Sequence, residues 1–289
     1  MKKNIALLLG LVLGLGFTSC SNDDDEDEGK YLAEMIITRY DWKNGKRSDE
    51  GKPYVINSYN ENGDLVRADR YVDGYRIDIL YDDKGDRTEG IVYDINDLKY
   101  ISGRYKYEYS YTDSGVVESS YKYNYQNKLV ITEKSEYDSG HKLKKWTEIV
   151  NTVTDDNGTV KTYSYSGNTE TIEVRDLYGS LSEKIVLELD SHDNVTKITS
   201  TNEWGGTSVS KYEYEYDSHG RLVKKIGPIY ASASVLGYIE QNAGYVEYTY
   251  NDDGTIWKEH YVDNVGVYNM DTYIQKQYEL EYTYKYNKK

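Results

Sequence analysis

The stretch Tyr212–Lys225 reads Tyr-Glu-Tyr-Glu-Tyr-Asp-Ser-His-Gly-Arg-Leu-Val-Lys-Lys and decides the fold. Tyr212, Tyr214 and Tyr216 alternate with glutamates, and this period of two places the three rings on one face of a strand. The Asp-Ser-His-Gly segment that follows predicts a type I turn, because Asp caps backbone N–H groups at its first position and Gly tolerates positive φ at its fourth. The stretch therefore predicts a β-hairpin whose return strand begins after Gly220.

The same unit recurs along the chain as a Tyr or small residue, Asp or Asn, two residues, Gly, one residue and an aliphatic residue. Copies begin at Tyr59, Tyr81, Tyr111 and Tyr250. Variants keep the turn without the tyrosine (Thr154–Val160), carry Asp where Gly is expected (Leu189–Val195) or are one residue short (Tyr137–Gly140). The mean period of roughly 27 residues indicates a repeat architecture in which each repeat holds two strands and two turns.

The N-terminal segment predicts export and lipidation. Residues 1–19 contain two lysines followed by an apolar run that is too short to span a bilayer and is typical of a signal peptide. Cys20 is the only cysteine and follows this run directly, which predicts a lipoprotein site whose acylated thiol anchors the chain without spanning the membrane. Ordinary cleavage near Ser19 is the alternative. The acidic segment that completes residues 20–29 predicts a flexible tether.

Two resemblances follow from these motifs. The string Tyr-x-Tyr-Asp-x-x-Gly-Arg-Leu that starts at Tyr214 resembles the YD repeat of the RHS proteins. Combined with Cys20 and the acidic residues behind it, which resemble a surface-export signal, the chain is similar to Tyr-rich surface lipoproteins of Bacteroidetes with a porin-like β fold. The resemblance implies hairpin architecture and lipid anchoring at the outer membrane, exposed at the cell surface. It transfers no catalytic residue.

Residues 30–289 are expected to form a single Tyr-rich domain of tandem β-hairpins. The chain holds 35 Tyr but 1 Phe and 2 Pro, alternation is widespread, and no window has a helical stripe. On the order of 16–20 strands fit this length, more than an open sheet usually keeps. We therefore predict an all-β antiparallel meander that curls and closes into a water-soluble barrel. A membrane-spanning barrel is disfavoured, because Tyr alternates with polar residues on the strands.

The sequence predicts no enzyme, no catalytic residue, no metal site and no cofactor. No nucleophile motif occurs, and the histidines lack the spacing of metal ligands. They are His141, His192, His219 and His260. Paired carboxylates such as Asp252 and Asp253 occupy turn positions, which turn chemistry explains. A net charge of −15 disfavours nucleic acid as a partner.

Two tryptophans near Gly-rich turns, Trp42 and Trp204, are the candidate ligand-binding residues, because exposed aromatic rings stack on sugars. Trp146 and Trp257 fall in return strands, where core packing is expected. Two further stretches interrupt the repeat. They are a polar insertion at residues 41–53 and a stretch without charge alternation at residues 226–244. We expect both to be long loops, the second with a short helical turn.

These observations favour a non-enzymatic cell-surface lipoprotein that acts as a binding module for extracellular glycan or peptide, anchored to the membrane through Cys20. The alternative is a structural envelope component, or a shell around a partner chain as the RHS resemblance implies.

Overall fold

The computed structural model describes residues 30–43, 45–151, 156–231, 233–234, 237–238, 244–266 and 273–288. The predicted signal peptide (1–19) and the predicted lipidation site with its tether (20–29) lie outside these residues. Within them the chain is all-β, and its elements follow in simple order.

Most of the strands are between six and sixteen residues long. They are β1 (Lys30–Lys43), β2 (Lys46–Arg47), β3 (Lys52–Tyr59), β4 (Leu65–Arg70), β5 (Tyr75–Tyr81), β6 (Arg87–Asp94), β7 (Asp97–Thr112), β8 (Gly115–Asn124), β9 (Leu129–Asp138), β10 (Leu143–Asn151), β11 (Asp156–Ser166), β12 (Thr169–Asp176), β13 (Leu181–Leu189), β14 (Val195–Asn202), β15 (Thr207–Tyr216), β16 (Leu222–Ala231), β17 (Ala233–Ser234), β18 (Gly237–Tyr238), β19 (Tyr245–Tyr250), β20 (Ile256–Gly266) and β21 (Tyr273–Lys288).

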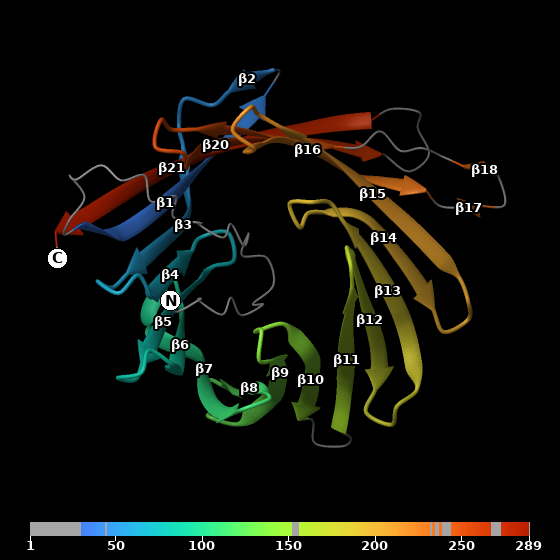
Figure 1. The fold of residues 1–289 in the computed structure, drawn as a ribbon. Coiled ribbons are helices and arrows are strands. Elements are labelled where there is room, and N and C mark those ends of the chain that lie inside the picture. The colour runs from blue at the N-terminus through green and yellow to red at the C-terminus, as the bar shows by residue number, and fades with distance from the viewer. Residues whose placement is uncertain are drawn as a thin grey trace.

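Eighteen of these strands form an antiparallel meander that closes into a barrel. Each strand pairs with its neighbour in sequence, and β1 closes the ring by pairing with β21 on one side and with β3 on the other. Figure 1 shows the chain colour running around the ring until red β21 meets blue β1. The short β2 pairs with the last two residues of β1, and the β17–β18 hairpin lies outside the ring. Closure leaves no long unpaired edge between β1 and β21.

The register assigns the side chains of the wall to two faces. Paired residues share a face, so the face of Ile37 can be followed through Tyr107 and Tyr214 to Leu280. When hydrogen-bonded neighbours are followed from strand to strand around the barrel, starting on β1 and going first to β3, the path comes back to β1 at a residue nearer its carboxyl end. Because the strands of a barrel tilt with a right-handed sense, this direction of shift places the face of Ile37 inside. Most buried apolar side chains lie on this inner face.

The outer face of the barrel is charged. Ion pairs between neighbouring strands run around it. They are Arg67–Asp78, Arg76–Asp69, Arg104–Glu89, Lys197–Glu188 and Lys224–Glu247. A wall that faces lipid needs an apolar band on every strand instead. At these paired positions the outer face therefore carries charges and not such a band.

The inner face carries most of the tyrosine rows. Tyr212, Tyr214 and Tyr216 point inward together, while Glu213 and Glu215 point outward, which confirms the pattern expected from the sequence. β8 is an exception, because its register turns Tyr121 and Tyr123 outward, where they meet Glu108 and Lys106 of β7. Alternation alone therefore predicts that rings share a face, but not which face it is.

Most hairpins use one turn geometry. In the turn after β15 the Asp217 carboxylate accepts the N–H groups of His219 and Arg221 at 2.8 and 2.9 Å, and Gly220 has φ +76°. The same cap is made by Asn60, Asp82, Asn124, Asp138, Asp176, Asp190 and Asn202. The Asp or Asn side chain stabilises the turn, because it accepts hydrogen bonds from backbone N–H groups that the tight turn leaves unpaired.

Tyrosine hydroxyls join successive hairpins. In each case the hydroxyl donates to the main-chain carbonyl of the first residue of a return strand, where the register shifts by one residue. The pairs are Tyr81 with Leu65, Tyr165 with Leu143, Tyr214 with Val195, Tyr250 with Leu222 and Tyr284 with Ile256. A bulge withdraws its carbonyl from the ladder, so an added donor satisfies it. This explains why the chain uses Tyr where Phe would pack equally well.

Four expectations from the sequence were wrong. Residues 226–231 do not begin a loop: β16 runs through Pro228 to Ala231, and Pro228 is tolerated because it sits where the β15–β16 register shifts. The polar insertion at 41–53 is largely β1, β2 and β3. Asn157 and Gly158 lie in β11 and not in a turn, since they pair with β10. The turn after Tyr137 is not one residue short, because His141 takes the Gly position with φ +61°.

Candidate functional site

The meander places its connections at two ends of the barrel, and the turn tips at the two ends differ in chemistry. At one end, where β1 starts, the turns carry small or charged residues at their tips. These tips are Glu61–Asn62, Asp83–Lys84, Asp113–Ser114, Ser139–Gly140, Gly167–Asn168, Ser191–His192, Ser218–His219 and Asp252–Asp253. We call this end the polar rim.

The opposite end exposes large apolar side chains, and we call it the aromatic rim. Such residues lie on four of its connections, or, in the case of Leu98 and Tyr100, at the start of β7. They are Tyr71 and Val72 (42% and 47% exposed), Leu98 and Tyr100 (44% and 47%), Tyr125 (61%), Tyr178 (90%) and Trp204 (83%). At the polar rim the exposed large side chains lie on the strands and not on the turn tips: Leu80, Tyr111, Trp257 and Tyr286 are 48%, 57%, 42% and 51% exposed. Exposed aromatic residues that gather at one end of a protein are a candidate binding surface.

Turn geometry directs these rings into solvent. Asn202 accepts the N–H groups of Trp204 and Gly206 through Oδ1, at 3.1 and 2.8 Å. Asp176 holds Tyr178 in the same way at 2.9 Å. The third residue of such a turn points away from the barrel, which is the position of His219 in the Asp217 turn of the polar rim. Tyr178 and Trp204 are thus rigid, exposed anchors on short turns.

The two tryptophans selected from the sequence differ in their surroundings. Trp204 is exposed as expected. Trp42 is not: its ring stacks on His260 with centroids 4.8 Å apart, and its Nε1 is buried. The longer β1 carries Trp42 onto the outer wall rather than into a turn. Trp146 is half-buried and is not one of the buried core residues, with Lys161 Nζ 4.7 Å from its ring centre. Trp257 is 42% exposed and does not belong to the core either.

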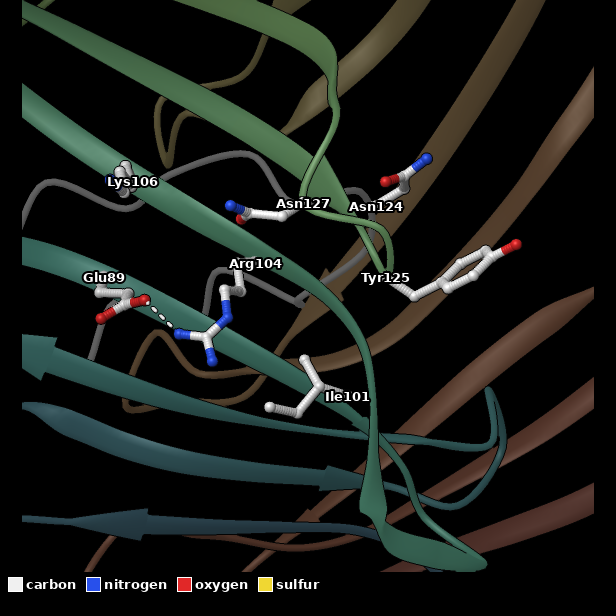
Figure 2. A pocket seen from close by; sticks show the side chains of 7 residues that line it. All are labelled: Glu89, Ile101, Arg104, Lys106, Asn124, Tyr125 and Asn127. Atoms are coloured by element: carbon white, nitrogen blue, oxygen red, sulfur yellow. Dashed lines mark hydrogen bonds and ion pairs between the residues drawn. The ribbon is translucent and has the colours of Figure 1, made fainter.

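A hollow of about 550 Å³ lies on the outer wall where it meets the aromatic rim. It is lined by Glu89, Ile101, Arg104, Lys106, Asn124, Tyr125 and Asn127. Figure 2 shows this wall with the opposite strands of the barrel behind it, the Glu89–Arg104 contact, and the two asparagines on the β8–β9 turn. The hollow therefore combines side chains of β6 and β7 with a turn from the next hairpin.

Geometry within the hollow is fixed by neighbouring contacts. Arg104 Nη1 lies 3.0 Å from Glu89 Oε1, and Lys106 Nζ lies 5.8 Å from the ring centre of Tyr123. At its edge Tyr125 pairs with Tyr100, with ring centres 6.3 Å apart and planes inclined by 35°. The composition, rings beside cations and amides, suits a polar ligand with an apolar face. Sequence reasoning missed the hollow, because its residues come together only through the β6–β7–β8 register.

The acidic turn residues cap turns. Backbone N–H groups hold the pKa of Asp82, Asp176 and Asp217 below its ordinary value, the largest contributions coming from the amides of Asp86, Ser180 and Arg221. Among the residues that the structure describes, no three His, Cys, Asp or Glu side chains gather as metal ligands.

Two buried carboxylates lie on the inner face. Burial raises the pKa of Glu118, against the nearby positive charge of Arg87 at 2.9 Å. Burial likewise raises the pKa of Glu259, which accepts the hydroxyl of Tyr261 at 2.5 Å. They lie far apart around the ring, on β8 and β20, so they do not form a catalytic pair.

Comparisons with known proteins give structural similarity without sequence similarity. No family model and no curated protein matches the chain. A porin-like protein from Bacteroides uniformis is similar with TM-score 0.44 and 11% identity, over 88% of this chain and 96% of that one. A porin-like protein from Bacteroides vulgatus gives TM-score 0.36 and 11% identity, over 86% and 98%. A TcdB2-TccC3 structure gives 0.38 and 13%, over 78% of this chain and 14% of that one.

No helix among the described residues has the length and apolar character needed to cross a membrane.

Proposed function

We propose that this chain is a non-catalytic surface lipoprotein whose barrel binds an extracellular glycan at the aromatic rim. The observation that carries the proposal is the difference between the rims. Tyr125, Tyr178 and Trp204 are exposed at one end, and the equivalent tips at the other end are polar. Rigid aromatic rings beside asparagine amides suit sugars, which present an apolar ring face and hydroxyl groups.

Chain direction supports an outward orientation of this rim. β1 begins at Lys30 on the polar rim, so a lipid on Cys20 would be joined to that end through residues 21–29. The aromatic rim would then face away from the membrane. Proteinase treatment of intact cells, with and without Cys20→Ser, tests this display: the wild-type protein is expected to be cleaved from the surface, and protection in intact cells would contradict it.

Glycan-array binding of the full-length lipidated protein in detergent tests the binding role. Tyr178→Ala and Trp204→Ala are each expected to weaken binding about tenfold, the effect of losing a stacked ring. His219→Ala is the matched control, because His219 occupies the same turn position at the polar rim and is expected to bind as the wild type does. A blank array, or rim variants equal to the control, would overturn the proposal, and binding of peptide alone would replace glycan with peptide.

A further inference from the structure

The hollow beside the β8–β9 turn is a cationic spot on an acidic protein. Arg104 and Lys106 stand against the single carboxylate of Glu89, whereas the chain as a whole carries a net charge of −15. A guanidinium has five N–H donors. Glu89 contacts Arg104 through Nη1, so other N–H groups of Arg104 can bind the carboxylate of a ligand beside that of Glu89. The charge of this hollow therefore favours an anionic ligand in a molecule that otherwise repels one.

The asparagines of the hollow are fixed by the turn. Asn124 Oδ1 accepts the N–H groups of Gln126 and Lys128, both at 3.0 Å, which leaves the donor end of the amide facing away from the turn backbone. Asn127 has φ +59°, the left-handed conformation that the turn requires at this position. In Figure 2 the amide of Asn127 lies over the strand that carries Lys106, whereas the side chains of Asn124 and Tyr125 extend away from Arg104. Such amides match the hydroxyl groups of a sugar.

An aromatic wall lies next to these polar groups. Tyr125 and Tyr100 are 61% and 47% exposed, although their rings are close enough to interact. Because Tyr125 lines the same hollow as Arg104 and Lys106, a ligand bound there can contact both the cations and this ring. The hollow volume of about 550 Å³ lies in the range of small-ligand sites.

We propose that this hollow binds an anionic sugar, a pyranose ring that carries a carboxylate or a sulfate. The anionic group pairs with Arg104 and Lys106, a hydroxyl group accepts from Asn127, and an adjoining ring of the glycan stacks on Tyr125 and Tyr100. This inference deepens the proposed function and rests on it, since it names the class of glycan that the aromatic rim takes.

Binding of the full-length lipidated protein to immobilised polysaccharides tests the inference. The probes are polygalacturonate (carboxylated), dextran sulfate (sulfated), dextran (neutral) and polyphosphate (anionic but not a sugar). Arg104→Gln and Lys106→Gln are each expected to weaken binding of the anionic polysaccharides about tenfold, the loss of one charge-assisted contact. Glu89→Gln is expected to strengthen it. Arg67→Gln is the matched control, because Arg67 forms an equivalent outer-face pair with Asp78 at 2.9 Å, away from the hollow.

The outcomes separate the two proposals. Anionic binding that falls in the Arg104 and Lys106 variants but not in the control supports the inference, and the preferred polysaccharide identifies carboxylate or sulfate. Equal binding of dextran, unaffected by these variants, overturns the inference and leaves the proposed function standing. Equal binding of polyphosphate with the same dependence on Arg104 overturns the assignment to a sugar. Absence of binding to every polysaccharide overturns both proposals.

Discussion

The hydroxyl of Tyr250 on β19 donates to the carbonyl oxygen of Leu222 on β16 at 2.6 Å, across 28 residues of sequence. Leu222 lies at the register shift that follows the Asp217 turn, so its carbonyl lies outside the regular ladder. Four further tyrosines make the same contact to the preceding return strand. The tyrosine of one repeat thus satisfies the bulge of the repeat before it, and this contact ties the hairpins together around the barrel.

Tyr250→Phe is expected to destabilise the barrel by about 1 kcal/mol, because it removes the donor and leaves the Leu222 carbonyl without it. Tyr178→Phe is the control, since Tyr178 is 90% exposed and its loss of a hydroxyl is expected to change stability by less than about 0.5 kcal/mol. Urea unfolding of both variants measures the difference. Equal midpoints for the two would show that the hydroxyl contact contributes nothing.

His141→Gly and Asp193→Gly are each expected to stabilise the fold by up to about 1 kcal/mol. Both residues have positive φ, +61° and +62°, in a turn position that Gly occupies in the equivalent hairpins. A Cβ is unfavourable in this conformation, so removing it relieves strain. Gly220→Ala should have the opposite effect, because Gly220 has φ +76°. Thermal unfolding measures the signs, and a lower melting temperature for both glycine variants would contradict the turn geometry.

Replacing Asp82, Asp176 and Asp217 together by Asn is expected to reduce the loss of unfolding free energy as the pH falls. The folded-state pKa of these groups is lowered by backbone N–H groups. Their contribution is therefore complete above the unfolded-state pKa of about 3.9 and is lost as the pH falls through the folded-state values. Asn makes the same caps at Asn60, Asn124 and Asn202 without titrating. Unfolding curves between about pH 2 and 5 that decline equally in both proteins would count against this.

Glu259→Gln is expected to raise the melting temperature at neutral pH. Burial raises the folded-state pKa of Glu259, so its charge opposes folding once the pH exceeds the unfolded-state pKa of about 4.3. The advantage of Gln should shrink below that pH, where the wild-type carboxyl is also neutral. Melting temperatures at about pH 3 and 7 test this. A Gln variant that is less stable at neutral pH would show that the ionised form contributes net stability through the hydroxyl of Tyr261.

The sequence predicts the architecture because its signals are local. Alternation at Tyr212–Tyr216 and the Asp217 turn are set by neighbouring residues, and repetition of such hairpins predicts a closed meander. The turn at Asn124 was missed, since Asn127 stands where Gly is expected, although Asn also tolerates positive φ. The exposure of Trp204 was predicted from a local signal, because the adjacent Gly205 and Gly206 indicate a turn.

The candidate site depends on non-local pairing that sequence patterns do not contain. Arg104 meets Glu89 only because β6 and β7 pair with shifts of register before that point, and shifts of this kind are not visible in alternation. The stack of Trp42 on His260 requires β1 and β20 to be neighbours of β21, which follows from closure alone. Likewise, the Tyr250–Leu222 contact needs both the β16–β19 pairing and the bulge.

Hydrogen–deuterium exchange of the full-length protein with and without polygalacturonate tests the central claim, that ligand is held at the aromatic rim. The account predicts slower exchange at the amides of residues 124–128, on the turn beside Arg104, and unchanged exchange at residues 217–221 of the polar rim. Protection confined to the polar-rim turns, with residues 124–128 unaffected, would contradict it.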